Sequence, residues 1–73
     1  MTVTEMVENL NEMLGKLNLS FEEMTLQSRQ LESTDLSEIS TRVQVIIESS
    51  ELLIIQVKNV IEQGEDIVKV VGR

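Results

Sequence analysis

The stretch LSEISTRVQVIIESSELLIIQVKNVIEQGEDIVKVV, residues 36–71, decides the fold of this chain. Mostly apolar residues recur in it at alternating steps of three and four: Leu36, Ile39, Val43, Ile46, Ser50, Leu53, Val57, Val60, Gly64, Ile67 and Val71. An average spacing of 3.5 residues places such a row along one side of an α-helix that packs lengthwise against another helix. The repeat therefore predicts one long helix over residues 36–71.

A β-strand interpretation has to be weighed, because Val and Ile are abundant here and both favour strands. The apolar runs at residues 45–47 and 52–55 do not alternate with polar residues, and no turn residues separate them. No proline occurs anywhere in the chain. The uninterrupted 3.5-residue repeat outweighs the β propensity of single residues, and a helix is favoured.

The first part of the chain keeps the same rhythm and predicts a helix over residues 3–31. Its predicted inner row is Val3, Val7, Leu10, Leu14, Leu17, Phe21, Met24, Ser28 and Leu31. Thr2 followed by Glu5 is typical of a capping box, in which the two side chains satisfy free backbone N–H groups at a helix start.

A second capping pattern, Ser20 followed by Glu23, leaves open a break of this helix near residues 18–20. Gly15 lies just before it and adds to that alternative. The inner row passes through these residues without a shift, so one continuous helix is favoured.

Four polar residues, Glu32 to Asp35, separate the two periodic segments. Ser, Thr and Asp suit a turn because their side chains offer the backbone local hydrogen bonds. Asp35 with Glu38 predicts an N-cap and its capping-box partner. A turn of this length makes the two helices antiparallel. The expected fold is all-α: one domain, residues 1–73, forming an antiparallel two-helix hairpin that resembles a coiled coil.

A chain of 73 residues has room for only a small core, since domains of this size bury about 60% of their unfolded surface. Small domains gain stability from disulfides, a structural metal or another chain. The sequence contains neither Cys nor His, which excludes disulfides and the common zinc sites. Another chain remains as the expected source of stability.

The charge balance makes nucleic acid and anionic membranes improbable partners. Thirteen acidic and six basic residues give a net charge of −7, which repels phosphate groups. Phe21 is the single aromatic residue, so base stacking is not available either. Residues 1–8 do not resemble a secretory signal peptide, and no apolar run approaches the ~20 residues of a membrane span. We expect a soluble protein of the cytoplasm.

The residues needed for catalysis are missing from the sequence. Without His or Cys there is no conventional nucleophile–base pair. Carboxylates gather in two groups: Glu5, Glu8 and Glu12, and Glu62, Glu65 and Asp66. Their spacing lacks the Asp-rich loop of calcium sites, so solvated acidic faces are the favoured interpretation. The sequence predicts no enzyme activity, no cofactor and no metal site.

The helix over residues 36–71 carries more apolar residues than one neighbouring helix can cover. A row at steps of seven runs beside the first, and three further residues fall outside both rows. The predicted partner-binding residues are Val45, Ile47, Leu52, Ile54, Ile55, Ile61 and Val68. In the first helix, Met6, Met13, Leu19 and Leu26 are expected at the edge of the core. We expect the folded chain to exist chiefly in complex with another protein or with copies of itself.

Size, acidity, absence of Cys and a hairpin with a polar turn at Glu32 to Asp35 resemble the small co-chaperones of type III secretion systems. The resemblance implies a bacterial cytoplasmic protein that docks on a larger helical chaperone and helps to keep the needle subunit soluble before export. Needle subunits are also helical hairpins, but their turns typically carry proline, which is absent here. A four-helix homodimer and a structural or adaptor coiled-coil subunit remain as alternatives.

Overall fold

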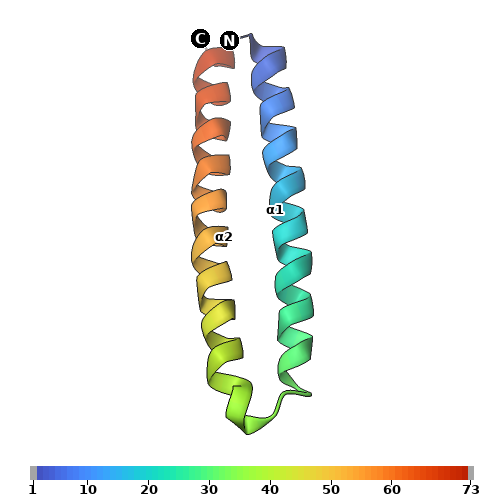
Figure 1. Ribbon diagram of the computed structural model, residues 1–73. Coiled ribbons are helices and arrows are strands. Elements are labelled where there is room, and N and C mark those ends of the chain that lie inside the picture. The colour runs from blue at the N-terminus through green and yellow to red at the C-terminus, as the bar shows by residue number, and fades with distance from the viewer. Residues whose placement is uncertain (1, 73) are drawn as a thin grey trace.

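The computed structural model describes residues 2–72, which form two α-helices, α1 (Val3–Leu31) and α2 (Leu36–Val71). The helices run side by side in opposite directions, with both ends of the chain at the same end of the molecule (Figure 1). The hairpin measures 56 × 15 × 15 Å between its outermost Cα atoms. The predicted all-α hairpin is confirmed, and both helices coincide with the predicted ranges.

Helix α1 begins after Thr2, which is the N-cap as predicted, and runs without a break, although the Glu5 carboxylate bonds to the Thr2 hydroxyl and not to a backbone N–H. The Thr2 hydroxyl oxygen accepts a hydrogen bond from the Glu5 N–H at 3.1 Å and donates to the Glu5 carboxylate at 3.1 Å. Ser20 does not cap a second helix, because its hydroxyl donates to the Lys16 carbonyl one turn earlier, at 3.2 Å. The continuous helix is therefore confirmed, and the break near residues 18–20 is excluded.

The polar turn closes the end of α1 through local hydrogen bonds. Ser33 and Thr34 both donate their hydroxyl protons to the Gln30 carbonyl, which has no partner within the helix. Asp35 is the N-cap of α2 as predicted, but its side chain forms no capping hydrogen bond. The Asp35 carbonyl accepts from the Glu38 N–H instead, at 2.9 Å, so the predicted capping box at this position is wrong.

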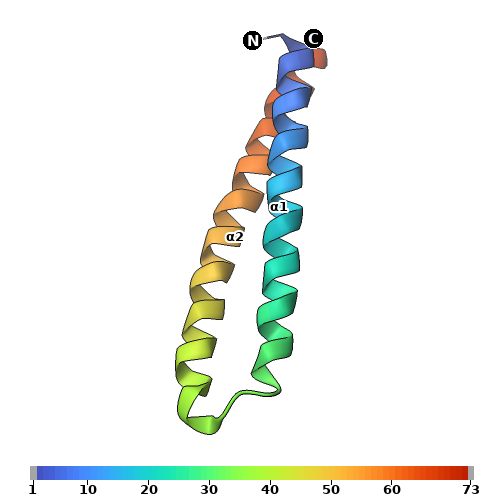
Figure 2. The same cartoon turned by 45° about the vertical axis from the view of Figure 1, so that its right-hand side comes forward.

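Along α2, most residues of the predicted row face α1. The half-buried members of the row are Ile39, Ile46, Ser50, Leu53, Val57, Val60, Gly64 and Ile67. Leu36, Val43 and Val71 are exposed, which corrects their assignment to the core. Leu36 and Val71 are the first and last residues of α2, and Figure 2 shows that α2 extends beyond α1 at the end with the turn.

The predicted inner row of α1 combines two rows at steps of seven, one through Leu10 and one through Val7, and only the row through Leu10 faces α2. Leu10, Leu17, Met24 and Leu31 are half-buried as expected. The second inner row is Met6, Met13, Ser20 and Gln27, whereas Val3, Val7, Leu14, Phe21 and Ser28 are exposed. A row at steps of seven can pair with a neighbouring row on either side of it. In the structure the row through Leu10 pairs with the row that contains Met6. Among the described residues Met6 is the only one with a buried side chain, 7% exposed.

The remaining residues expected at the edge of the core divide by type. Met6 and Met13 lie between the helices, as predicted, where an unbranched side chain fills irregular space. Leu19 and Leu26 are more than half exposed, so their placement at the core edge is wrong. The hairpin thus has a thin core and exposes most of its large apolar side chains.

Candidate protein-binding surface

One long side of the hairpin is polar, and two hydrogen bonds between the helices identify it. Near the turn, the Arg42 guanidinium donates to the Gln30 side-chain carbonyl at 3.2 Å. Near the chain ends, the Gln63 side-chain amide donates to the Met6 backbone carbonyl at 3.2 Å. We call this side the polar flank: Asn9, Lys16, Glu23 and Gln30 of α1, with Arg42, Ser49, Gln56 and Gln63 of α2.

The opposite long side of the hairpin is apolar. Each helix has two inner rows, and the residues of the polar flank come one position before one of them. In an antiparallel pair, the residues one position after the second inner row of each helix meet on the opposite side. On both helices these positions hold large apolar residues. We call this side the apolar flank: Val7, Leu14 and Phe21 of α1, with Ile47, Ile54, Ile61 and Val68 of α2. Their side chains are 41–70% exposed.

The residues of the apolar flank alternate between the two helices. Gln30 is hydrogen-bonded to Arg42, and Lys16 lines one small hollow with Gln56, which sets the antiparallel register. In that register each α1 residue of the flank lies midway between two α2 residues. Leu14, for example, is level with the interval between Ile54 and Ile61. One apolar side chain therefore occurs about every 5 Å along the flank.

The apolar flank is large enough for a specific protein contact. From Ile47 to Val68 it is about 32 Å long and, across two helices, about 20 Å wide. This rectangle of roughly 600 Å² includes the polar rows that border the flank, and as a whole it approaches the ~800 Å² that each partner contributes to a standard interface. A row of exposed apolar side chains within a surface of this size is typical of an interaction surface.

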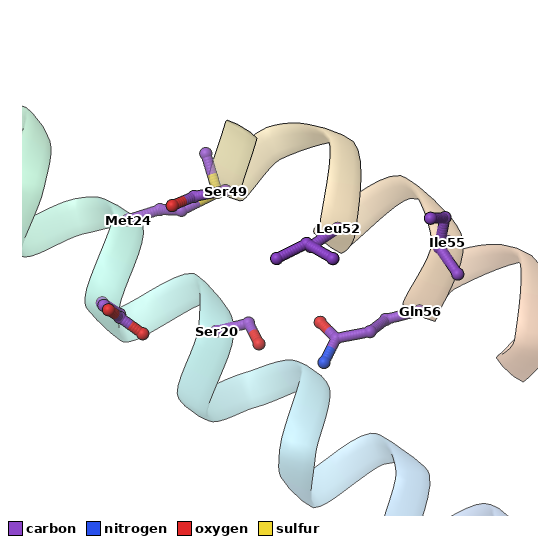
Figure 3. Close-up of a pocket in the computed structure, with 7 residues that line it drawn as sticks. Ser20, Met24, Ser49, Leu52, Ile55 and Gln56 are labelled. Atoms are coloured by element: carbon purple, nitrogen blue, oxygen red, sulfur yellow. The ribbon is translucent and has the colours of Figure 1, made fainter. Parts of the chain in front are cut away.

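The polar flank carries a hollow of about 300 Å³, shown in Figure 3. Ser20 of α1 and Ser49 of α2 both line it, and their small side chains leave the space between the helices open. Gln56 points toward this hollow, and its side-chain carbonyl oxygen is buried without a hydrogen-bond partner. Leu52 and Ile55 line the outer wall. This mixed, open depression differs from the continuous apolar surface on the other side.

The structure separates the seven predicted partner-binding residues. All seven are exposed. Ile47, Ile54, Ile61 and Val68 lie together on the apolar flank. Val45, Leu52 and Ile55 lie on other faces of α2. The sequence interpretation missed the α1 half of this surface, because Val7, Leu14 and Phe21 were assigned to the core.

Among residues 2–72, no group of three or more His, Cys, Asp or Glu side chains could hold a metal ion. Neither described helix is long and apolar enough to cross a membrane. No protein-family model matches the chain, and comparisons with curated proteins and with solved structures found no match.

Proposed function

We propose that this chain is a protein-binding module whose apolar flank packs against a helical region of a larger protein. The observation that supports the proposal is the exposure, 41–70%, of seven large apolar side chains on one side of the hairpin. The opposite side is polar and already uses Gln30, Arg42 and Gln63 in hydrogen bonds between the helices. Among the described residues, the apolar flank is the longest row of exposed apolar side chains that spans both helices, whereas Leu52 and Ile55 are exposed beside the hollow of the polar flank.

Burial of the apolar flank would contribute a large part of the free energy of binding. Complete burial of a Val, Leu, Ile or Phe side chain contributes about 1.5–3 kcal/mol. Since these residues are about half covered already, a partner gains roughly 1 kcal/mol at each, or about 7 kcal/mol in total before the costs of association. That gain is as large as the net stability of many small domains.

The specific form of the proposal is a co-chaperone of a bacterial type III secretion system. The chain works in the cytoplasm, docks on a larger helical chaperone and helps to keep the needle subunit soluble before export. The hairpin, the polar turn, the absence of Cys and the net charge of −7 support it, as features shared with that family.

Co-expression with a helical needle-subunit chaperone from the same host, identified by a pull-down, tests the proposal. We expect a stable complex on size exclusion and a higher yield of soluble chain than when the chain is produced alone. A chain that neither binds that chaperone nor changes the solubility of the needle subunit would contradict the co-chaperone role. Binding to a different helical protein would support the protein-binding function and contradict the co-chaperone role.

A four-helix homodimer is the second candidate, because the apolar flank spans both helices, as does each half of a bundle made from two hairpins. Sedimentation equilibrium distinguishes the two candidates. A tight dimer that forms in the absence of any other protein supports the bundle, whereas a monomer that associates only with its partner supports the binding module.

A further inference from the structure

We infer that the occupant of the apolar flank is an amphipathic helix of another protein, whose edge along α2 carries basic, acidic and basic residues at seven-residue intervals. This inference rests on the proposed function and adds the chemistry of the partner. It follows from the different polar rows that border the flank on its two sides.

The row that borders the flank on α2 is charged in a regular order. It consists of Gln44, Glu51, Lys58 and Glu65, all exposed. Each lies four residues after or three residues before a flank residue, which makes them neighbours on the helix surface. A helix seated on the flank brings its own edge residues next to Glu51, Lys58 and Glu65. Opposite charges at those three places are favourable, and like charges are unfavourable.

The row that borders the flank on α1 has no charge. It consists of Thr4, Asn11, Asn18 and Thr25, all exposed. The acidic residues of α1 lie on other faces, so the net charge of −7 is not concentrated beside the flank. The partner helix therefore needs a charged edge only on the side of α2 and a neutral polar edge on the side of α1.

A second copy of this chain does not satisfy the charged row. If the two hairpins meet face to face with their turns at opposite ends, α2 of one copy lies on α2 of the other. Lys58 is near the middle of the flank. Lys58 then meets Lys58 of the other copy, and Glu51 meets Glu65. If the turns lie at the same end, the charged row meets the uncharged row of α1. With the whole flank overlapping, neither arrangement pairs opposite charges. A slide by one heptad would pair Glu51 with Lys58 of the other copy but would leave Val68 of each copy uncovered, which favours a different protein as the occupant.

Two synthetic peptides of three heptads test the inference. Both have Leu and Ile at the apolar positions and a neutral Ser/Gln edge, and one carries Lys–Glu–Lys and the other Glu–Lys–Glu on the second edge. Charges on their outer faces are adjusted to equal net charge, which removes long-range attraction as an explanation. We expect the chain to bind the Lys–Glu–Lys peptide about fivefold more tightly, the sum of three modest exposed pairs.

Reversal of the row must reverse the preference. The triple variant Glu51→Lys, Lys58→Glu and Glu65→Lys is expected to bind the Glu–Lys–Glu peptide more tightly than the other. Equal binding of the two peptides, or an unchanged preference in this variant, would overturn the inference. A chain that sediments as a dimer and binds neither peptide would overturn it in favour of a second copy.

A matched control lies on the outer face of α2. The triple variant Glu48→Lys, Glu62→Lys and Lys69→Glu changes the net charge by the same amount, but these residues do not border the flank. We expect this variant to keep the original preference, and a reversal in it would also overturn the inference. If both peptides bind equally and flank substitutions still abolish binding, the charge order fails while the protein-binding function stands.

Discussion

The two long sides of the hairpin differ in the hydrogen bonds that their side chains make between the helices. On the polar flank, side chains reach across to the other helix, as Arg42 does to Gln30 and Gln63 to Met6. On the apolar flank, seven large side chains remain 41–70% exposed. The polar flank thus contributes to holding the hairpin closed, whereas the apolar flank is the surface that we propose for another protein. Substitutions on the two sides should separate stability from binding.

The largest expected effect on stability comes from the core between the flanks. Met6→Ala removes the buried side chain and is expected to lower the free energy of unfolding by about 2 kcal/mol. Phe21→Ala on the apolar flank should lower it by less than about 1 kcal/mol, because half of that side chain is already exposed. Urea denaturation followed by circular dichroism measures both. A greater loss at Phe21 would place that residue in the core.

The largest expected effect on binding distinguishes two adjacent isoleucines. Ile54 and Ile55 are each 54% exposed, but only Ile54 lies on the apolar flank. We expect Ile54→Gln to weaken binding of the helical partner about tenfold, which corresponds to roughly 1.4 kcal/mol. Ile55→Gln should change it less than twofold. Isothermal titration calorimetry gives both values.

The opposite order at Ile54 and Ile55 would move the binding surface to the outer face of α2, together with Val45 and Leu52. Equal losses would mean that the partner covers both faces, as the sequence pattern alone predicts. The assignment of Val45, Leu52 and Ile55 as partner-binding residues stays a prediction until this pair is measured.

On the polar flank, a substitution is expected to stabilise the hairpin. The side-chain carbonyl oxygen of Gln56 is buried without a partner, and such a group costs about 1–3 kcal/mol. Gln56→Leu should raise the free energy of unfolding by about 1 kcal/mol and leave partner binding unchanged. A loss of stability would show that water in the hollow already satisfies this oxygen.

The smallest expected effect concerns the two glycines inside the helices. A Cβ atom at Gly15 or Gly64 would meet nothing within 4 Å. Each replacement by Ala should therefore raise the free energy of unfolding by about 0.5–1 kcal/mol through helix propensity. Gly64 is half-buried and Gly15 is exposed, so equal gains show that the space beside Gly64 is open. A loss at Gly64 alone would indicate closer packing against α1.

The sequence predicts α2 better than α1, for a physical reason. In α2 the predicted row faces α1, because its neighbouring row on the other side contains Ser49, Gln56 and Gln63 and is plainly polar. In α1 the row through Leu10 has apolar residues on both sides, Met6 and Val7. A repeat of 3.5 residues cannot decide between two such sides.

Only the α2 half of the candidate surface could be predicted from the sequence. Ile47, Ile54, Ile61 and Val68 follow from the excess of apolar rows on one helix. Their combination with Val7, Leu14 and Phe21 depends on the rotation of α1 about its own axis, which is settled by packing between the helices and not by local pattern. The charged row on α2 can be identified as a border of this surface only after that rotation is known.

The central claim is that the isolated hairpin leaves its apolar flank in contact with water. Methyl NMR with a soluble paramagnetic agent tests this most directly, at a concentration where sedimentation shows a monomer. The account predicts that the methyl signals of Ile47, Ile54 and Ile61 broaden as strongly as that of the exposed Ile55, while Ile46 between the helices is protected. Protection of all three flank residues equal to that of Ile46 would contradict it.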